Sequence, residues 1–237
     1  MSVKPYAAEG SKREQVERMF DAISPRYDLL NRVFSMGTDQ GWRRKVMRMV
    51  AAEPVHHLLD VATGTGDLAI MAAKQVEQVT GADISAGMLA HGQRKVEQAG
   101  LAARVRMVQA DAADLPFAEN TFDAITVAFG VRNFEDLDRG IQGMFRVLRP
   151  GGRLFVLEFS KPRGALKPFF RFYFHRVMPF LGRLISKDNA AYRYLPASVD
   201  AFPEGEAFER VLRAAGGREV KSWRLSGGIA SLYVARK

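Results

Sequence analysis

The segment from Leu58 to Ala73, LLDVATGTGDLAIMAA, combines residue types that together form a nucleotide-binding turn. A buried strand is predicted over Leu58–Ala62, and the apolar residues after the glycines recur at helical spacing. Gly64 and Gly66 allow a ligand to approach the backbone, and unpaired N–H groups at the start of the next helix favour oxygen atoms or negative charge. The turn therefore predicts cofactor contacts at Thr63, Gly64, Thr65 and Gly66.

The glycine spacing fits two classes of cofactor, a dinucleotide and S-adenosylmethionine. Asp67 would lie in the first turn of the helix, where its carboxylate would repel a pyrophosphate. Asp60, near the end of the preceding strand, could accept a hydrogen bond from an amino group, which the pyrophosphate bridge of a dinucleotide lacks. Both acids favour S-adenosylmethionine, although both are also residue types that are common in caps and turns.

Three successive predicted strands end in acidic residues. After Asp60, the strand Val79–Ile84 carries Asp83 at its end, and the strand Val105–Ala110 is followed by Asp111. The carboxyl ends of parallel strands share one edge of a sheet, where the ligands of open α/β sheets bind. Asp83, with Ile84 beside it, is predicted to accept both ribose hydroxyls, and Asp111 with Ala112 is predicted to contact the adenine ring.

The rest of the chain continues the alternation of strands and helices. Ser85 is a predicted N-cap for a helix that ends near Gly100. Pro150–Gly152 is predicted as a tight turn. Further strands are predicted over Phe122–Phe129, Arg153–Phe159, Glu219–Trp223 and Ile229–Ala235, and further helices over Glu135–Leu148 and Glu204–Ala215. This order predicts an α/β fold with a doubly wound, mostly parallel seven-stranded sheet and an antiparallel C-terminal hairpin.

A single domain over residues 1–237 is predicted, in four parts. Residues 1–50 form an N-terminal helical cap, in which Pro25 breaks a helix with an apolar face (Val16, Met19, Phe20, Ile23). Residues 51–160 form the cofactor-binding core, residues 161–200 a helical insertion after the fifth strand, and residues 201–237 the C-terminal helix and strand pair.

Composition excludes several kinds of chemistry. The chain has no cysteine, so disulfides, cysteine-ligated zinc and thiol nucleophiles are excluded, and its four histidines lack metal-ligand spacing, so no metal is predicted. Its apolar runs are too short to span a bilayer, and its first residues are polar rather than signal-like, which predicts a cytoplasmic protein. The 47% hydrophobic content over 237 residues suffices for one core.

Residues 161–187 concentrate the positive charge of a chain whose net charge is +9. The segment carries no acid, and its basic residues alternate with aromatic and aliphatic ones (Lys161, Arg163, Lys167, Arg171, Arg176, Arg183, Lys187). This composition is typical of an interfacial helix or lid that contacts anionic lipid and admits an apolar ligand. Stacking on single-stranded RNA and a core-packing helix with a basic face are the alternatives.

Three stretches carry a resemblance to a known family: MFDAISPRYDLLNRVFSMGTDQGWRR at Met19–Arg44, the DVATGTGDLA turn, and residues 111–162, which end in LRPGGRLFVLEFSKP. The chain resembles the class I S-adenosylmethionine-dependent methyltransferases, and within them the C-methyltransferases of menaquinone and ubiquinone biosynthesis. The glycine turn is shared by many methyltransferases, whereas YDLLN, FGVRN and the LRPGG stretch are specific to the quinone family. The resemblance covers nearly the whole chain and supports cofactor contacts at Thr65, Asp83, Asp111 and Ala112.

The resemblance implies C-methylation of a prenylated naphthoquinol, demethylmenaquinol to menaquinol, with a ubiquinol precursor as the alternative acceptor. An aromatic carbon becomes nucleophilic when a neighbouring hydroxyl loses its proton. Arg132 stays charged but could hold a water or stabilise an oxyanion, and Asn133 could position it. Tyr27 and Asp28 are candidates for contacting the hydroxyls, or are structural turn and cap residues.

Two functions of other classes compete with quinol methylation. The basic segment is compatible with an RNA methyltransferase, although nucleic acid is not the favoured partner. A short-chain NAD-dependent dehydrogenase needs a Tyr and a Lys four residues apart in mid-chain, whereas here that spacing occurs at Tyr233 and Lys237. The expected partners are therefore the quinol and, peripherally, an anionic membrane surface, and a homodimer is left open.

Overall fold

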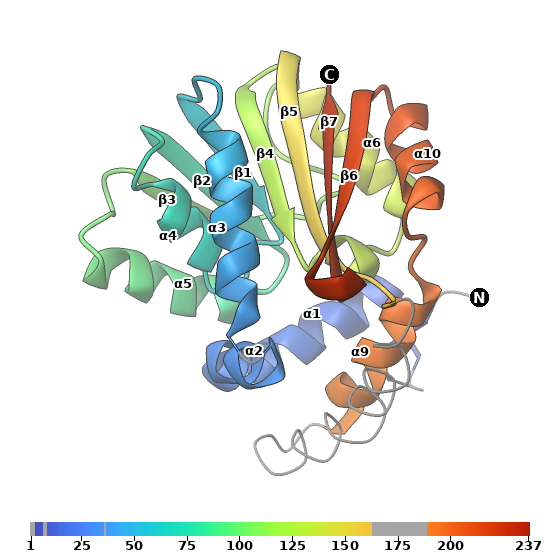
Figure 1. The fold of residues 1–237 in the computed structure, drawn as a ribbon. Helices are drawn as coiled ribbons and strands as arrows, with labels where there is room; N and C mark the ends of the chain where they lie inside the picture. The colour runs from blue at the N-terminus through green and yellow to red at the C-terminus, as the bar shows by residue number, and fades with distance from the viewer. Residues whose placement is uncertain (1–2, 7–8, 36, 163–188) are drawn as a thin grey trace.

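The structure is a computed structural model that describes residues 3–6, 9–35, 37–162 and 189–237. At its centre lies a seven-stranded sheet with the order β3-β2-β1-β4-β5-β7-β6 (Figure 1). All strands run parallel except β7, which is antiparallel to β5 and β6 and confirms the predicted C-terminal antiparallel pair. The strands are β1 (His57–Val61), β2 (Gln78–Asp83), β3 (Val105–Gln109), β4 (Phe122–Ala128), β5 (Leu148–Phe159), β6 (Arg218–Leu225) and β7 (Ala230–Arg236).

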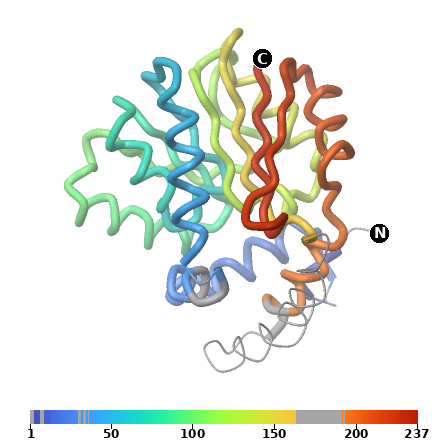
Figure 2. The backbone as a smooth tube through the Cα atoms, in the orientation of Figure 1, coloured from blue at the N-terminus to red at the C-terminus, as the bar shows by residue number. Residues whose placement is uncertain are grey.

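Helices cover both faces of the sheet and the carboxyl ends of its parallel strands (Figures 1 and 2). One face is covered by α3 (Thr38–Val50), α4 (Asp67–Ala72) and α5 (Ala86–Gln98), and the other by α6 (Leu137–Val147) and α10 (Glu206–Ala214). The strand ends are covered by α1 (Lys12–Ile23), the short turn η1 (Ser24–Arg26), α2 (Tyr27–Ser35) and α9 (Asn189–Ala201). Two further short turns are η2 (Val131–Asn133) and η4 (Ser226–Gly228).

Apolar side chains from these helices build a separate core on each face. On the α6 and α10 face, Ile141, Met144 and Phe208 are fully buried against the sheet. On the other face, Val46 and Val50 of α3 pack with the apolar residues of α4. The two layers hold the strands from both sides, which is the doubly wound arrangement expected from the sequence.

The helix starts agree with the capping residues in the sequence. Ser11 accepts a hydrogen bond from the Glu14 N–H while the Glu14 carboxylate accepts one from Ser11, a complete capping box for α1. Ser85 caps α5 by accepting from the Met88 N–H at 3.0 Å, as predicted. Pro25 lies in η1, so α1 ends at Ile23, immediately before the turn that carries this proline.

The prediction was wrong where α6 meets β5. The strand starts at Leu148, the residue predicted to end the helix, and Pro150–Gly152 lies inside β5 rather than in a tight turn. Leu148 pairs with Phe122, and the register then shifts before the next pair, Ala124 with Arg153. This irregularity accommodates a proline that has no N–H and Gly151 at φ +78°.

Residues 163–188, which hold most of the predicted basic insertion, lie outside the described residues. Among the helices that are described, none is long and apolar enough to cross a membrane.

Two helical glycines provide a matched test of how closely α5 approaches the turn after β1. An ideal Cβ on Gly92 would lie 3.2 Å from the Thr65 carbonyl carbon and 2.9 Å from Met107 Cε, whereas one on Gly41 of α3 would meet nothing within 4 Å. We expect Gly92→Ala to lower the free energy of unfolding by about 1–3 kcal/mol through overpacking. Gly41→Ala should raise it by up to about 1 kcal/mol through helix propensity. Urea unfolding measures both, and equal effects would contradict the close approach.

Candidate active site

A cavity lies at the carboxyl ends of β1, β2, β3 and β4, where the ligands of open α/β sheets bind. Its lining comes from the loops after these four strands and from the helices that cover them. The strand ends supply Val61, Asp83 and Ala128; the loops after them supply Ala62, Gly64, Ile84, Ala110, Asp111, Ala112, Phe129, Gly130, Asn133, Phe134 and Glu135; the helices supply Arg13, Val16, Phe20, Tyr27 and Met88. Segments far apart in the sequence therefore form one enclosure.

Asp83 and Asp111 place carboxylates on the wall of this cavity. Asp83 accepts hydrogen bonds from the Gly64 N–H at 2.8 Å and the Ser85 N–H at 2.9 Å, so its orientation is set by the loops on both sides. Burial raises the pKa of Asp83 to about 6, against the opposing effect of these hydrogen bonds. Asp111 accepts from the Ala113 N–H at 2.9 Å.

Asp60 lies beneath the glycine turn and not on the cavity wall. Its two oxygens accept hydrogen bonds from the hydroxyls of Thr63 in the turn and Thr126 on β4, both at 2.6 Å. The side chain is buried, and burial raises its pKa to about 6. Asp60 thus ties the turn to the neighbouring strand.

Two residues in the lining, Ala62 and Phe129, have positive φ angles of 51° and 62°. Such backbone conformations are unfavourable for residues with a Cβ and cluster at functional sites. The loops approach so closely that a Cβ on Gly130 would lie 2.5 Å from the Ala62 Cβ. The Phe129 ring stacks on Phe159 and packs against Trp42, with centroid distances of 4.4 and 6.1 Å.

Polar side chains of α1 attach the cap to the loops after β2 and β3. Arg13 Nε lies 3.1 Å from Asp111 Oδ2 after β3. Asp21 Oδ1 accepts from the Ser85 hydroxyl at 2.6 Å and from the Gly87 N–H at 2.9 Å after β2. The apolar side of the same helix therefore faces the cavity while its charges hold the rim.

Lys12 attaches the start of α1 to the loop after β4. Its Nζ donates to the carbonyls of Arg132 at 3.1 Å and Phe134 at 2.7 Å, and its N–H donates to Glu135 at 2.9 Å. Burial, with the nearby Arg132 charge, lowers the pKa of Lys12. The Lys12 ammonium is thus buried, and the hydrogen bonds that it donates go to backbone carbonyl groups.

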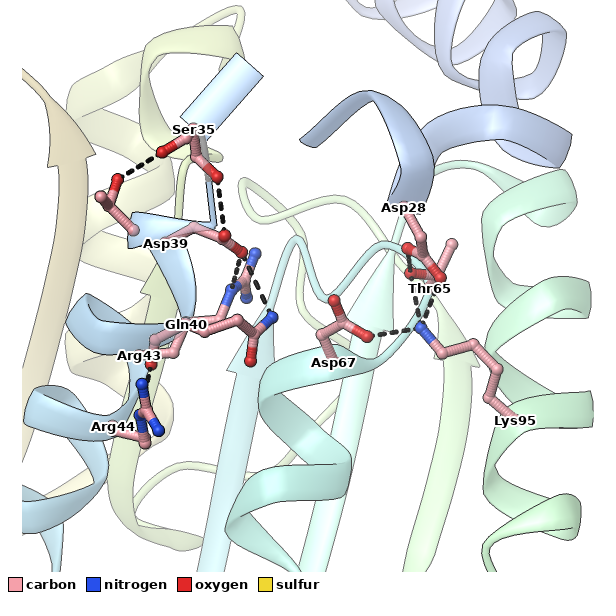
Figure 3. Close-up of polar contacts among 10 residues, drawn as sticks. Asp28, Ser35, Asp39, Gln40, Arg43, Arg44, Thr65, Asp67 and Lys95 are labelled. Atoms are coloured by element: carbon pink, nitrogen blue, oxygen red, sulfur yellow. Dashed lines mark hydrogen bonds and ion pairs between the residues drawn. The ribbon is translucent and has the colours of Figure 1, made fainter. Parts of the chain in front are cut away.

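Asp28, on α2, attaches the cap to the turn after β1 (Figure 3). Its carboxylate accepts from the Thr65 hydroxyl at 2.5 Å and from Lys95 Nζ of α5 at 2.7 Å. The same ammonium donates to Asp67 at 2.5 Å and to Thr65 at 3.2 Å. Lys95 therefore lies between the cap and the glycine turn and contacts both.

Arg132 and Glu158 form a buried ion pair beside the cavity. Arg132 Nη1 donates to Glu158 Oε1 at 2.8 Å and also to the Phe129 carbonyl, and the two side chains are 8% and 0% exposed. Burial raises the pKa of Glu158, and the charge of Arg132 opposes that shift. Arg132 does not line the main cavity but an adjacent recess, together with Lys12 and Ser198.

Several buried polar atoms near this pair have no hydrogen-bond partner in the part of the chain that the structure describes. They include Arg132 Nε, Asn133 Oδ1 and the Tyr194 hydroxyl. Asn133 lines the cavity, and its Nδ2 donates to the Phe129 carbonyl at 3.4 Å, so the free oxygen is an available acceptor. Burial raises the pKa of Tyr194 to about 12, which keeps its hydroxyl protonated at neutral pH.

The structure divides the predicted site residues into two groups. Tyr27, Gly64, Asp83, Ile84, Asp111, Ala112 and Asn133 line the cavity. Asp60, Thr63, Thr65, Gly66, Asp28 and Arg132 support its walls from outside the lining. Gly66 has φ +79°, a left-handed backbone conformation that favours glycine, and a Cβ there would lie 2.5 Å from the flexible end of the Met107 side chain.

Sequence reasoning missed Lys95, Glu158 and Tyr194. Glu158 had a signal, because it is a lone acid inside the otherwise apolar strand LFVLEF, and buried acids need partners. Lys95 and Tyr194 lie in ordinary amphipathic helices. The ion-pair partners of Lys95 and the apolar residues of α1 that pack with Tyr194 are remote in sequence, so no local pattern marks either residue.

We expect Arg132→Met to lower the free energy of unfolding by about 3–5 kcal/mol near neutral pH, because Glu158 loses its buried cation. An acid whose pKa is raised by folding contributes stability at low pH that is lost as the pH rises through the raised pKa. The defect should therefore shrink as the pH falls. Adding Glu158→Gln should recover part of the loss. Urea unfolding across pH measures this, and equal losses in the single and double variants would contradict it.

A family model described as the ubiE/COQ5 methyltransferase family matches residues 8–237. A demethylmenaquinone methyltransferase of Bacteroides fragilis is 48% identical over 238 residues, which cover 99% of this chain and 97% of that protein. One of the same name from Thermus thermophilus is 49% identical over 91% of this chain and 98% of its own length. A ubiquinone/menaquinone biosynthesis C-methyltransferase UbiE of Geotalea daltonii is 44% identical, covering 95% and 97%.

Solved structures with lower identity share the fold. The [4+2]-cyclase SpnF superposes with a TM-score of 0.69 at 22% identity and covers 97% of both chains. An S-adenosylmethionine-dependent methyltransferase of Thermotoga maritima, described as a possible histamine N-methyltransferase, gives 0.65 at 16% identity, covering 94% of this chain and 99% of that one. At these identities the likeness concerns the fold, which serves several reactions. The family model and the full-length relatives go further: the chain belongs to the ubiE/COQ5 methyltransferase family.

Proposed function

We propose that the protein transfers the methyl group of S-adenosylmethionine to a ring carbon of a prenylated quinol, with demethylmenaquinol as the acceptor. The observation that carries the proposal is the cavity that joins the Asp83 and Asp111 carboxylates to the unpaired Asn133 oxygen. The relatives named demethylmenaquinone methyltransferase support this acceptor. The UbiE relative supports a ubiquinol precursor as the second candidate.

The residues of the cavity fit the proposed cofactor. When bound, S-adenosylmethionine supplies an electrophilic methyl group on a positively charged sulfur. Asp83 would accept both ribose hydroxyls, because two backbone N–H groups already hold its carboxylate in place. Asp111 and Ala112 would contact the adenine ring. Gly64 allows close approach to the turn, where a Cβ would already lie 3.5 Å from Tyr27.

The acceptor would lie against the Asn133 side of the cavity. The free Oδ1 of Asn133 would accept a hydrogen bond from a quinol hydroxyl and so orient the ring. Tyr27 and Phe20 of the cap would exclude water from the transfer. Since methyl transfer is one displacement, most of the rate enhancement would come from this alignment.

We further propose that the basic segment 161–187 contacts an anionic membrane, where a polyprenyl quinol resides. Its seven Lys and Arg residues without an acid support this. Its described residues, Lys161 and Pro162, lie two and three positions after Phe159, which ends β5 at the carboxyl edge of the sheet.

The deciding experiment offers demethylmenaquinol and a demethylated ubiquinol precursor separately, in anionic and zwitterionic vesicles, and identifies products by mass spectrometry. We expect a singly C-methylated naphthoquinol, formed faster on anionic vesicles, and none without S-adenosylmethionine. Methylation of the ubiquinol precursor alone would reassign the acceptor. Methylation of neither, with methylation of added RNA, would overturn the proposal.

Protonation of Asp83 should weaken cofactor binding. Ribose hydroxyls favour the ionised carboxylate, so binding lowers its pKa, and affinity falls as the pH falls through the pKa of the free protein, about 6. We expect affinity for S-adenosylhomocysteine, measured by calorimetry, to fall about tenfold between about pH 7.5 and pH 5, because about a tenth of the carboxylate remains ionised there. Asp83→Asn should bind weakly with a flatter pH profile. An unchanged profile in that variant would contradict the assignment.

A further inference from the structure

Lys95 contacts both the cap and the glycine turn, which form two walls of the cavity. On one side it binds Asp28, the neighbour of the wall residue Tyr27. On the other side it binds Thr65, within the glycine turn, and Asp67, the residue that follows the turn. Figure 3 shows the ammonium between the two carboxylates, with the Thr65 hydroxyl beside it.

The contact between the cap and the glycine turn depends on the positive charge of Lys95. Two carboxylates, Asp28 and Asp67, share one ammonium at 2.7 and 2.5 Å. Without it, like charges from the cap and from the turn would face each other. The three side chains are 24–32% exposed, so dissolved salt screens their attraction in part. The strength of the contact between cap and turn should therefore vary with ionic strength.

We propose that Lys95 is a positioning residue for the cofactor, which holds the cap wall against the glycine turn and so controls how fast the cofactor leaves. The inference rests on the proposed function only in taking this cavity as the S-adenosylmethionine site. Tyr27 is adjacent to Asp28, which binds the turn through both Thr65 and Lys95. Loss of Lys95 would leave the Thr65 hydrogen bond opposed by repulsion between Asp28 and Asp67, and would loosen the cap where Tyr27 approaches Gly64 beside the cofactor. The lysine acts through both walls and does not line the cavity.

The test measures dissociation of S-adenosylhomocysteine from the full-length protein by chase with unlabelled ligand at low and high salt. We expect Lys95→Met to speed dissociation about 1.5- to fivefold at low salt, the range of exposed ion pairs. The wild type should lose ligand faster as salt rises, and Lys95→Met should show little salt dependence. Lys95→Arg should restore slow, salt-sensitive release.

Arg94→Met is the matched control, because it removes one positive charge from the same helix at a side chain that contacts His91. Its dissociation rate should equal that of the wild type. Asp28→Asn, added to Lys95→Met, should slow release again or leave it unchanged, since it removes the repulsion with Asp67. If each substitution changes the dissociation rate by the same factor whether or not the other is present, the proposal is overturned.

Two outcomes separate this inference from the proposed function. If the wild type does not bind S-adenosylhomocysteine, the proposed function fails. If it binds, and Lys95→Met lowers the melting temperature without changing the release rate or its salt dependence, Lys95 is merely structural and this inference alone fails.

Discussion

The hydrogen bonds of one buried carboxylate connect the glycine turn to the middle of the sheet. Asp60 is the penultimate residue of β1, and its oxygens accept hydrogen bonds from Thr63 in the turn and Thr126 on β4. The strand order changes direction between β1 and β4, and such a switch point opens a crevice at the carboxyl edge of a parallel sheet. Because Asp60 is buried, both oxygens need donors, and satisfying them determines where the turn lies. The close approach of Ala62 to Gly130 follows from the same constraint.

The cap contacts the loop that follows each of the strands β1, β2, β3 and β4. One helix and its continuation send a charged side chain to each of the four loops: Asp28, Asp21, Arg13 and Lys12, after β1, β2, β3 and β4 respectively. These contacts are polar and lie at the rim, whereas Val16 and Phe20 face the cavity. Lys12 is buried, whereas the contacts of Asp28, Asp21 and Arg13 are partly exposed and add little stability individually, so this side of the cap is held by several weak bonds. Such an attachment can open locally without unfolding the sheet.

The sheet and the acidic strand ends could be predicted because both depend on local patterns. Apolar runs located the strands, and Asp83 and Asp111 follow from strand ends. Local sequence gives only part of the electrostatics of Asp67. An isolated acid at a helix start repels anions, but the fold places the ammonium of Lys95, 28 positions away, against this carboxylate. Arg132 was treated as a free cation for the same reason, although Glu158 lies against it. Local sequence does not encode such pairings, since the fold brings the partners together.

The aromatic packing around Phe129 has a spectroscopic consequence. Of the two tryptophans, Trp42 packs against Phe129, which lines the cavity, and its indole N–H donates to the Ser226 hydroxyl at 2.9 Å. Trp223 lies on the edge strand β6. A molecule that enters the cavity and shifts the Phe129 ring changes the surroundings of one indole and leaves the other as an internal reference. The protein therefore carries a built-in fluorophore for the occupancy of its own site.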